Sequence, residues 1–228
     1  YLYDAMNRRV ARWVGEDGMY FYAWDGWQKV QEMTLRDQGG VPSAELKQFV
    51  WGEQLDELIA YRRSADSGAN WENFYIAEGG AHCPTRVLNE AGAVVETQEY
   101  DPYGKTTFYD AGGAAHAVSQ VGNSFGWKCV SIDRETGLAY MRNRHYHSDL
   151  GRFVSRDPLG SGGDPATFLN ANNYGSARPL TQADPMGLQI SGQEMSFLYD
   201  VWDAFLGVFL DTVPKKPELQ IRAINTDI

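Results

Sequence analysis

Tight-turn sequences recur along the first 150 residues, and their spacing constrains the fold of this chain more than any other feature. Glycine beside aspartate or asparagine is typical of β-turns, because glycine tolerates positive φ and the acidic or amide side chain bonds nearby backbone N–H groups. Such turns come about every 8 to 12 residues, at Glu16-Asp17-Gly18, Asp25-Gly26, Gly52-Glu53 and Asn89-Glu90-Ala91-Gly92. Intervals of this length accommodate strands and exclude long helices. The sequence therefore predicts a mainly β fold of antiparallel hairpins, with less than about a tenth of residues 1–150 in helix.

The segments between these turns have the composition of half-buried sheet surfaces. Aromatic residues make up 13% of the chain, with 13 Tyr and 7 Trp, and this content favours strands over exposed loops. We expect strands at 10–14, 19–24, 27–35, 46–51, 55–62, 71–77, 85–88, 93–100, 125–132 and 138–147. The polar segment 36–45 is expected to be a loop, and the Gly- and Ala-rich segment 110–123 is expected to be irregular.

A Tyr-Asp pair occurs near the start of the chain at Tyr3-Asp4 and returns at Tyr100-Asp101, with a weaker echo at Tyr109-Asp110. Repetition of one short motif indicates a stacked or spiralling β array, in which each hairpin buries its face against its neighbours. An ordinary antiparallel sandwich with coincidental Tyr-Asp pairs is the alternative. The residues alone leave both architectures open.

Composition and charge exclude several classes of protein. The net charge of −10 disfavours a nucleic-acid-binding surface, because such a surface requires an excess of Lys and Arg. Only two cysteines are present, so the chain is no disulfide scaffold, and Cys83 and Cys129 either pair or stay free. The sequence has no apolar run of about 18 residues, so it predicts no membrane-spanning helix. The chain starts at Tyr1 without an initiator Met, and we expect it to be a piece of a longer protein.

Two Asp-Pro-x-Gly units lie in one segment of the chain, at Asp157–Gly160 and Asp184–Gly187. Proline fixes φ and glycine accepts positive φ, so each unit predicts a tight turn. Two such turns could bring two carboxylates within hydrogen-bond distance, where they cannot both ionise easily and share a proton. The protonated one can polarise a carbonyl and the ionised one can take a proton from water, which is the chemistry of an aspartic protease. The alternative is that both turns are purely structural.

Other chemically capable residues are weaker candidates. His145 and His147 place two imidazoles on one strand face, but a zinc site needs three or four ligands. His82 and Cys83 are neighbours in the sequence, with no acid in view to orient the imidazole. Asp164 is a third carboxylate between the two turns, and it ranks behind the first Asp-Pro aspartate because no arginine precedes it. We therefore predict no metal and no cofactor.

Several segments near the end of the chain resemble the C-terminal core of RHS/YD-repeat proteins. They are Gly137–Tyr146, Gly151–Phe153, Ser155–Pro158 and Asp184–Leu188. That family ends its shell with Pro-x-x-x-x-Asp-Pro-x-Gly-Leu, and the stretch from Pro179 to Leu188 fits this pattern at every fixed position, including Pro185 and Gly187. The resemblance extends over roughly residues 1–188. The chain departs from the family at Ser176-Ala177-Arg178, since the family has Asn-Asn before the proline.

The resemblance implies a β shell that spirals around its own C-terminal segment and cuts itself. In this family the scissile bond follows the Leu of the motif, which here is the bond between Leu188 and Gln189. The resemblance further implies that Asp157 and Asp184 are the catalytic aspartates, acting on a bond of their own chain at a unimolecular effective concentration. Arg156 is then a candidate to position a carboxylate or to stabilise developing charge.

Three regions are predicted from the resemblance and the residue pattern: a repeat shell segment at 1–136, a core plug with the self-cleavage motif at 137–188, and a tail at 189–228. Within the tail, Gln193–Val213 has the apolar periodicity of a helix. This helix is too short and too acidic to cross a bilayer, and its contact with a membrane interface stays open. We expect the tail to be the start of an effector or a leader helix.

The predicted function is that of a shell fragment that encloses a C-terminal effector segment and releases it by intramolecular aspartic-type autoproteolysis after Leu188. Its expected partners are its own C-terminal segment, the rest of the shell, and a secretion-system spike or an immunity protein. The resemblance implies export, either secretion or display at the cell surface, and no nucleic acid is expected on this region. The alternative is a non-catalytic repeat module for surface adhesion or carbohydrate binding, with exposed aromatic residues as contact platforms.

Overall fold

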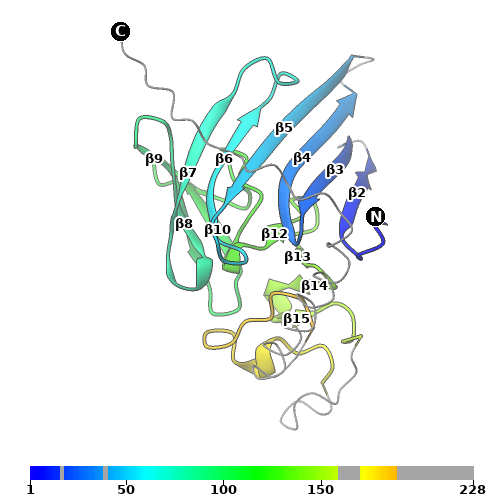
Figure 1. Ribbon diagram of the computed structural model, residues 1–228. Helices are drawn as coiled ribbons and strands as arrows, with labels where there is room; N and C mark the ends of the chain where they lie inside the picture. The colour runs from blue at the N-terminus through cyan, green and yellow to red at the C-terminus, as the bar shows by residue number, and fades with distance from the viewer. Residues whose placement is uncertain (16–17, 38–40, 159–169, 189–228) are drawn as a thin grey trace. The chain divides into compact units, whose positions relative to one another are not determined.

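The computed structural model describes residues 1–15, 18–37, 41–158 and 170–188 of the 228-residue chain (Figure 1). Backbone contacts divide the chain into Tyr1–Gln189 and Ile190–Ile228, and the described residues belong to the first of these parts. The sequence expectations for Asp164, for Gln189 and for the helical pattern of 193–213 lie outside the described residues, and those for the turns at 16–18 and 157–160 do so in part. No helix in the described part of the chain is long and apolar enough to cross a membrane.

The larger sheet is antiparallel, and its eleven strands follow one another in chain order. The strands are β1 (Leu2–Tyr3), β2 (Arg9–Val14), β3 (Gly18–Asp25), β4 (Gln28–Asp37), β5 (Pro42–Trp51), β6 (Leu58–Ser64), β7 (Glu72–Glu78), β8 (Pro84–Leu88), β9 (Val94–Tyr100), β10 (Thr106–Asp110) and β11 (Ala115–His116). Each strand pairs with the next one along the chain, so the sheet is a continuous meander. This confirms the predicted mainly β fold of antiparallel hairpins.

The predicted loop at 36–45 is shorter than expected, since β4 continues to Asp37 and β5 begins at Pro42. Arg36 pairs with Glu45 between these two strands at 3.2 Å. Both side chains are partly exposed, and a cross-strand ion pair of this kind stabilises a ladder that faces solvent. A polar segment in the sequence therefore did not mean a loop, because polarity alone does not separate an exposed strand end from a turn.

The repeated Tyr-Asp pair marks one kind of hairpin turn, which recurs with Asp or Asn at its first position. Four such turns start at Asp4, Asn89, Asp101 and Asp110. In the third, Oδ1 of Asp101 accepts the N–H groups of Tyr103 at 2.9 Å and of Lys105 at 2.8 Å, and Gly104 takes a φ of 84°. The carboxylate closes the turn, and the residue three places later supplies the left-handed conformation. What repeats along the chain is therefore a turn chemistry.

The second sheet is small and lies in the last third of the described chain. Its strands are β12 (Ser131–Ile132), β13 (Ala139–Met141), β14 (Arg144–His147) and β15 (Arg152–Phe153). The prediction of one strand over 138–147 is wrong, because the chain reverses between Met141 and Arg144, which pair across a two-residue turn. Arg142 takes a left-handed φ of 54° in that turn, and no glycine marks the reversal in the sequence.

The strand predicted at 125–132 forms only at its end, as β12. Before it, the chain turns through the 3-10 segment η3 (Trp127–Cys129), in which Lys128 and Cys129 both take a φ of 53°. The apolar and aromatic residues of this segment predicted a strand. They are instead buried in the core without pairing in a β-ladder.

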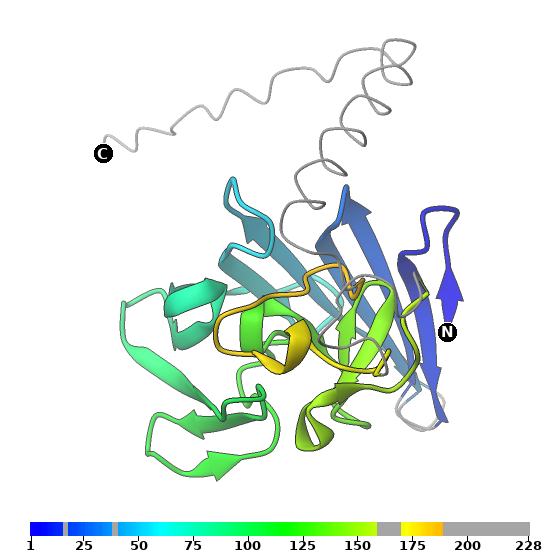
Figure 2. The same ribbon diagram turned by 90° about the horizontal axis from the view of Figure 1, so that it is seen from below.

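One face of the larger sheet lies against the second sheet and the loops around it (Figure 2). Charged side chains are buried on this face. Buried on this face are Arg9, Arg12, Lys29, Glu32, Lys47 and Glu96. Arg9 binds both carboxylate oxygens of Asp133, at 2.7 and 2.8 Å, and Arg142 binds Asp56 of the β5–β6 turn at 2.6 Å. Bidentate and short ion pairs therefore connect the two halves of the described chain.

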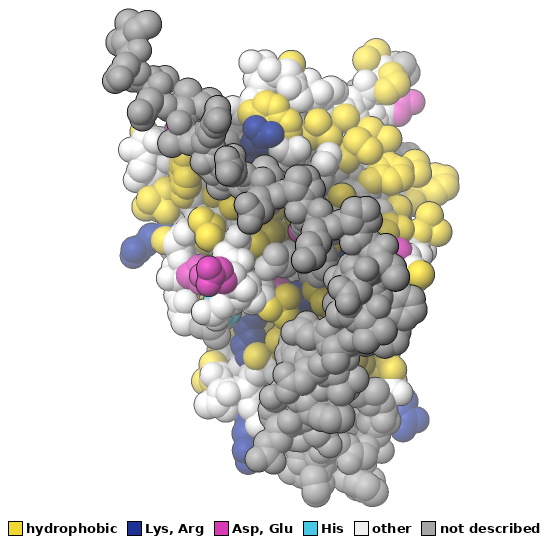
Figure 3. Space-filling view, viewed as in Figure 1, with side chains coloured by type: hydrophobic (Ala, Val, Ile, Leu, Met, Phe, Trp, Pro, Cys, Tyr) yellow, Lys and Arg dark blue, Asp and Glu magenta, His cyan; other side chains and the backbone are white. Residues whose placement is uncertain are grey.

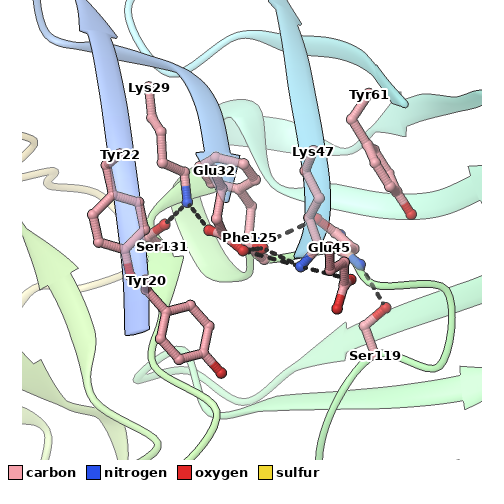
Figure 4. Close-up of polar contacts among 12 residues, drawn as sticks. Tyr20, Tyr22, Lys29, Glu32, Glu45, Lys47, Tyr61, Ser119, Phe125 and Ser131 are labelled. Atoms are coloured by element: carbon pink, nitrogen blue, oxygen red, sulfur yellow. Dashed lines mark hydrogen bonds and ion pairs between the residues drawn. The ribbon is translucent and has the colours of Figure 1, made fainter. Parts of the chain in front are cut away.

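Glu32 is the centre of one such charged cluster (Figure 4). Its carboxylate accepts hydrogen bonds from Lys29 at 2.7 Å and from Lys47 at 3.0 Å, and Lys29 also donates to Ser131 of β12 at 2.7 Å. Burial alone raises the pKa of Glu32, but the two ammonium groups outweigh burial and hold the pKa well below its usual value. Removing one partner would leave an uncompensated buried charge, so the cluster couples β4 and β5 to the second sheet.

Two apolar clusters complete the core. The first consists of Phe49, Leu58, Tyr61, Phe74, Val87, Phe125 and Cys129. The second consists of Cys83, Trp127, Val130, Ala139, Met141, Tyr146, Phe153 and Tyr174. The aromatic rings of this second cluster meet at centroid distances between 5.0 and 6.0 Å, which favours a rigid base for the segment that follows Tyr174.

Many apolar side chains also remain on the surface of the described residues (Figure 3). Trp13 and Leu180 are each 75% exposed, and Leu2 and Val41 are each 66% exposed. Exposed apolar residues are common singly, but several large ones on one sheet indicate a surface that suits contact with further polypeptide.

Candidate functional site

The second Asp-Pro-x-Gly unit, at 184–187, is held by the hairpin turn between β13 and β14. The carbonyls of Pro185, Met186 and Gly187 accept hydrogen bonds, in that order, from Arg142, Asn143 and Arg144. Asn143 contributes twice, through its backbone N–H at 3.2 Å and its Nδ2 at 2.9 Å. Three successive carbonyls of the unit are thus bonded by three successive residues of the hairpin. A shift of the unit along the hairpin would break these hydrogen bonds, so its position is fixed.

Gly187 shows why the motif has glycine at this place. Its φ is 63°, in the left-handed region, and an added Cβ would lie 2.3 Å from the carbonyl oxygen of Met141. Any side chain would therefore be strained twice, by the backbone conformation and by a clash with β13. The glycine allows the turn to approach the hairpin closely enough for the hydrogen bonds described above.

The structure brings Asp157 and Asp184 together on one guanidinium. Nη2 of Arg144 lies 3.0 Å from Oδ2 of Asp157 and 2.8 Å from Oδ2 of Asp184, so these two oxygens are no further apart than the sum of the two distances. All three side chains are almost fully buried. The guanidinium stacks on the Phe153 ring at 3.5 Å from its centroid, and Nη1 donates to the carbonyl of Ala171 at 3.1 Å. Its geometry is thus fixed from every side.

The electrostatics of this group favour a proton on Asp184. Burial raises the pKa of Asp184, and the negative charge of Asp157 adds to the rise. The Arg144 guanidinium and the hydrogen bond from the Leu188 N–H lower this pKa without cancelling the rise. Burial also lowers the pKa of Arg144 from its very high ordinary value, since its charged form is desolvated. The site is therefore a buried pair of acids with a shared cation, and one of the acids holds its proton to a higher pH than an exposed aspartate.

The chain ahead of the predicted scissile bond contacts Asp184 directly. Oδ1 of Asp184 accepts the backbone N–H of Leu188 at 2.7 Å, while the backbone N–H of Asp184 donates to the Tyr174 hydroxyl at 3.2 Å. Within Leu188, only Cα separates this N–H from the carbonyl carbon. This hydrogen bond therefore holds Leu188, the residue that supplies the carbonyl group of the predicted scissile bond. Gln189 lies beyond the described residues.

Arg156 does not take part in this group, because its side chain is exposed. The cation beside the aspartates is Arg144, which the sequence did not single out. It belongs to an Arg-x-Arg pair inside the stretch 138–147, which the sequence predicted to be one strand. Two buried carboxylates require a buried cation close to them. This requirement is the signal from which a buried arginine could have been predicted. Pro179 of the motif is buried, and its carbonyl accepts a hydrogen bond from Lys128 at 2.9 Å.

The weaker candidates have other partners. The ring of His145 packs between those of Tyr1 and Tyr140, with centroids at 5.3 and 5.6 Å. Across the described residues, no group of three or more His, Cys, Asp or Glu side chains could hold a metal ion. His82 contacts Glu78 at 3.1 Å through Nδ1, whereas the Cys83 sulfur accepts a backbone N–H at 3.2 Å. Cys83 and Cys129 are both buried and form no disulfide.

Comparison with known proteins finds toxins among the relatives of this chain. It is 30% identical to the toxin protein Tse5 of Pseudomonas aeruginosa over 83% of this chain and 15% of that protein. It is 27% identical to the probable deoxyribonuclease RhsA of Dickeya dadantii, over 82% of this chain and 12% of that protein. A further relative, the tRNA3(Ser)-specific nuclease WapA of Bacillus spizizenii, is 27% identical over 82% of this chain and 7% of its own length. The chain therefore corresponds to a small part of each relative. No family model matches it.

Solved structures with a similar fold belong to the TcdB2–TccC3 complex. One matches 82% of this chain and 9% of its own chain, with a TM-score of 0.60 and 21% identity. A second, without the hypervariable C-terminal region, has a TM-score of 0.56 at 20% identity. These similarities concern the fold, and they agree with the meander of antiparallel hairpins described above. Together with the named relatives, they show that the chain is an RHS-repeat protein with the mainly β architecture of an RHS shell segment.

Proposed function

We propose that this chain is part of an RHS shell that encloses a C-terminal segment and releases it by cutting its own backbone after Leu188. The observation that carries the proposal is the pairing of Asp157 and Asp184 on one guanidinium, with the Leu188 N–H on a carboxylate of that pair. Two buried acids that share one cation are a suitable acid and base for peptide hydrolysis. The remaining evidence is the fit of residues 179–188 to the family motif.

In the proposed reaction Asp184 is the acid and Asp157 is the base. Asp184 is assigned as the acid because its pKa is raised, and the Asp157 carboxylate takes a proton from an attacking water. The water oxygen bonds to the Leu188 carbonyl carbon while the Asp184 proton moves to the carbonyl oxygen. The tetrahedral intermediate then loses its bond to the Gln189 nitrogen, which receives the proton from Asp157, and returns a hydroxyl proton to Asp184. The products are a carboxyl group on Leu188 and an amino terminus on Gln189.

The fold supplies the substrate to this site without diffusion. The chain on the acyl side of the bond is the motif turn itself, fixed to the β13–β14 hairpin through the Pro185, Met186 and Gly187 carbonyls. A bond held in this way reacts at an effective concentration far above that of any free peptide. Cutting should therefore be intramolecular, and its rate should not depend on protein concentration.

The decisive experiment is the intact mass of the purified chain and of two variants, Asp157→Asn and Asp184→Asn. Wild type should yield a fragment ending at Leu188, and each variant should slow its appearance by at least about 100-fold, since each removes one proton-transferring group. The two losses should not add in the double variant, because the pair acts as one unit. Asp149→Asn is the matched control, because the Asp149 side chain is exposed and pairs with Lys105 rather than with Arg144.

Two results would contradict the proposal. Wild type that stays intact at every pH from acid to neutral would exclude self-cleavage, and cleavage that slows on dilution would exclude an intramolecular site. If Asp157→Asn cut as fast as wild type, self-cleavage would survive and the assignment of its partner acid would fall.

The proposed partners follow from the same function. They are the enclosed C-terminal segment and the rest of the shell, together with a secretion-system spike or an immunity protein in an exported toxin. The names of the relatives, which include a toxin and several nucleases, support a toxic segment as cargo. Co-expression of the full-length protein with its neighbouring genes, followed by affinity purification, tests these partners.

A second candidate function is a non-catalytic module for surface adhesion or carbohydrate binding. It is favoured by exposed aromatic side chains on the larger sheet, with Trp13 at 75% and Tyr75 at 49% exposure. Under this alternative the Arg144 cluster is only a structural ion pair, and the wild-type chain never cuts. Binding to a glycan array that is lost in Trp13→Ala, with an intact chain throughout, would favour it.

A further inference from the structure

Lys128 occupies a strained and tightly held position beside the motif segment. It sits in the turn from Gly126 to Val130, which is closed by the hydrogen bond from the Gly126 N–H to the Val130 carbonyl at 3.0 Å. The backbone of Lys128 has a φ of 53°, which is unfavourable for a residue with a side chain. Its own N–H donates to the Cys83 sulfur at 3.2 Å. Strain of this kind persists where the surrounding structure over-determines it, and it often accompanies function.

The Lys128 ammonium binds backbone carbonyls of the motif segment. Nζ donates to the carbonyl of Pro179 at 2.9 Å and to that of Gln182. It also lies over two aromatic rings, at 4.5 Å from the centroid of Trp127 and 5.2 Å from that of Tyr174. Within the described residues it forms no salt bridge with a carboxylate. Because its hydrogen-bond acceptors are backbone carbonyls, Lys128 fixes the position of the backbone and does not neutralise a charged side chain.

The contacts of Lys128 lie before Asp184 in the chain, and the contacts of the β13–β14 hairpin, with Pro185, Met186 and Gly187, lie after it. Gln182 precedes Asp184 by two residues, and the Tyr174 ring under the ammonium carries the hydroxyl that accepts the Asp184 N–H. The backbone of Asp184 is therefore located by Lys128 from one direction and by the β13–β14 hairpin from the other. A shift of this backbone by about 1 Å would cost on the order of 100-fold in a reaction that depends on placement.

We propose that Lys128 is a positioning residue for the self-cleavage: through the carbonyls of Pro179 and Gln182 it places the Asp184 carboxyl against Arg144 and the Leu188 amide. This inference rests on the proposed function, and it adds to it a residue outside the family motif. Among the described residues, Lys128 has no hydrogen bond or ion pair with the dyad oxygens or with Leu188, so its effect is on geometry.

The charge of Lys128 gives the inference a pH signature. Burial lowers the pKa of Lys128 to about 8, and the Asp184 carboxylate offsets that only in part. The Tyr174 hydroxyl and the Cys83 thiol both have raised pKa values because they are buried, so neither becomes an anion near pH 8. As pH rises through about 8 the ammonium loses its proton and its cation–π contacts, and its hold on the carbonyls weakens.

The test uses hydrogen exchange in the full chain carrying Asp157→Asn, so that it reads position without requiring cleavage. The amides to follow are those of Asp184, Gly187 and Leu188, whose hydrogen bonds depend on the placement of the motif. With Lys128 present, protection of these amides, corrected for intrinsic exchange, should fall by about tenfold between pH 7 and 9.5. Lys128→Arg should hold its protection over that range, because a guanidinium stays charged. Lys128→Met should show the low value at every pH.

Cleavage of chains with the intact dyad provides the second measurement. At one fixed pH below 7, Lys128→Met should cut at least about tenfold more slowly than wild type, and Lys128→Arg should restore most of the rate. Lys105→Met is the control, since the side chain of that lysine is 59% exposed and pairs with the surface residue Asp149.

The outcomes separate the two proposals. If wild type does not cut, the proposed function fails while the exchange experiment still decides the role of Lys128. If wild type cuts and Lys128→Met matches it in rate and in protection, the inference is overturned. Should Lys128→Met fail to fold, the pH dependence of protection in the Lys128 and Lys128→Arg chains decides the question, and equal protection in both from pH 7 to 9.5 would overturn it.

Discussion

Arg144 is the residue on which the candidate site depends most. Its Nε binds the Gly187 carbonyl, its Nη1 the Ala171 carbonyl, and its Nη2 both aspartates, so one planar fork satisfies the motif turn and the dyad together. Lysine has no such fork and could not reach all four acceptors. At the scale of the residue, Arg144 therefore fixes the positions of both carboxylates.

The pH dependence of cutting follows from the raised pKa of Asp184. The folded chain binds this proton more tightly than the unfolded chain does, so the contribution of Asp184 to stability is complete below the ordinary carboxyl pKa of about 4 and is lost as pH rises through the higher folded value. The acid form is also the one that donates in the reaction. We expect the fragment ending at Leu188 to appear faster at mildly acidic pH than at pH 8, as measured by timed intact mass. A rate that increases steadily from pH 5 to 8 would contradict this assignment of the acid.

Ala177 offers a test of the departure from the family pattern. It has a φ of 59° and is exposed, and Ser176 before it has a φ of 53°. Asparagine tolerates this left-handed conformation better than alanine, so Ala177→Asn should raise the free energy of unfolding by about 0.5–1 kcal/mol. Urea unfolding of the Asp157→Asn chain measures this. Ala114→Asn, at an exposed position without positive φ, should show no gain, and an equal gain at both positions would contradict the explanation.

At the scale of the element, the β13–β14 hairpin marks the limit of what the sequence predicts. Asp157 and Asp184 could be paired from the two Asp-Pro-x-Gly units, because turn chemistry is local and visible. Arg144 could not, because its position depends on the reversal at Arg142, where φ is 54° without a glycine. Likewise the charged interior involves partners such as Lys29 and Ser131, which are 102 positions apart, and no local pattern encodes such a pair.

Gly187 tests whether close contact between the motif turn and this hairpin matters. In Gly187→Ala the new Cβ would lie 2.3 Å from the Met141 carbonyl oxygen, in addition to the strain of positive φ. Gly92→Ala is the matched control, since Gly92 has a φ of 75° and open space around its Cβ position. In the uncut Asp157→Asn chain, Gly187→Ala should lower the free energy of unfolding by at least about 1 kcal/mol more than Gly92→Ala, from overpacking alone.

Equal losses of stability in the two variants would mean that only φ matters at Gly187. In a chain with the intact dyad, Gly187→Ala should also abolish the fragment ending at Leu188, because the turn can no longer seat against Arg142, Asn143 and Arg144. Gly92→Ala should cut at the wild-type rate, since its turn joins β8 and β9 on the larger sheet.

At the scale of the whole chain, the larger sheet has two ends to its strand order, β1 and β11. An antiparallel meander that does not close leaves backbone N–H and C=O groups at its outer strands, and these pair readily with other strands. Exposed apolar side chains accompany the β1 edge, where Leu2 is 66% exposed. The relatives are far longer than this chain, so in a complete shell more polypeptide is available to cover such edges.

The 228-residue chain should therefore self-associate in solution, and ionic strength should show how. Edge pairing and apolar contact favour association, while the net charge of −10 opposes it through repulsion between copies. Because salt screens that repulsion, sedimentation velocity should show more oligomer at about 0.5 M than at about 0.05 M salt.

Leu2→Lys should reduce association at both salt concentrations, since it puts a charge on the β1 edge and removes an exposed apolar side chain. Glu90→Lys lies on the β8–β9 turn, away from either edge of the sheet. It changes the net charge more than Leu2→Lys does, and it should not reduce association. A strictly monomeric chain at every concentration and salt would show that the edges are protected, and would argue against an open segment of a larger sheet.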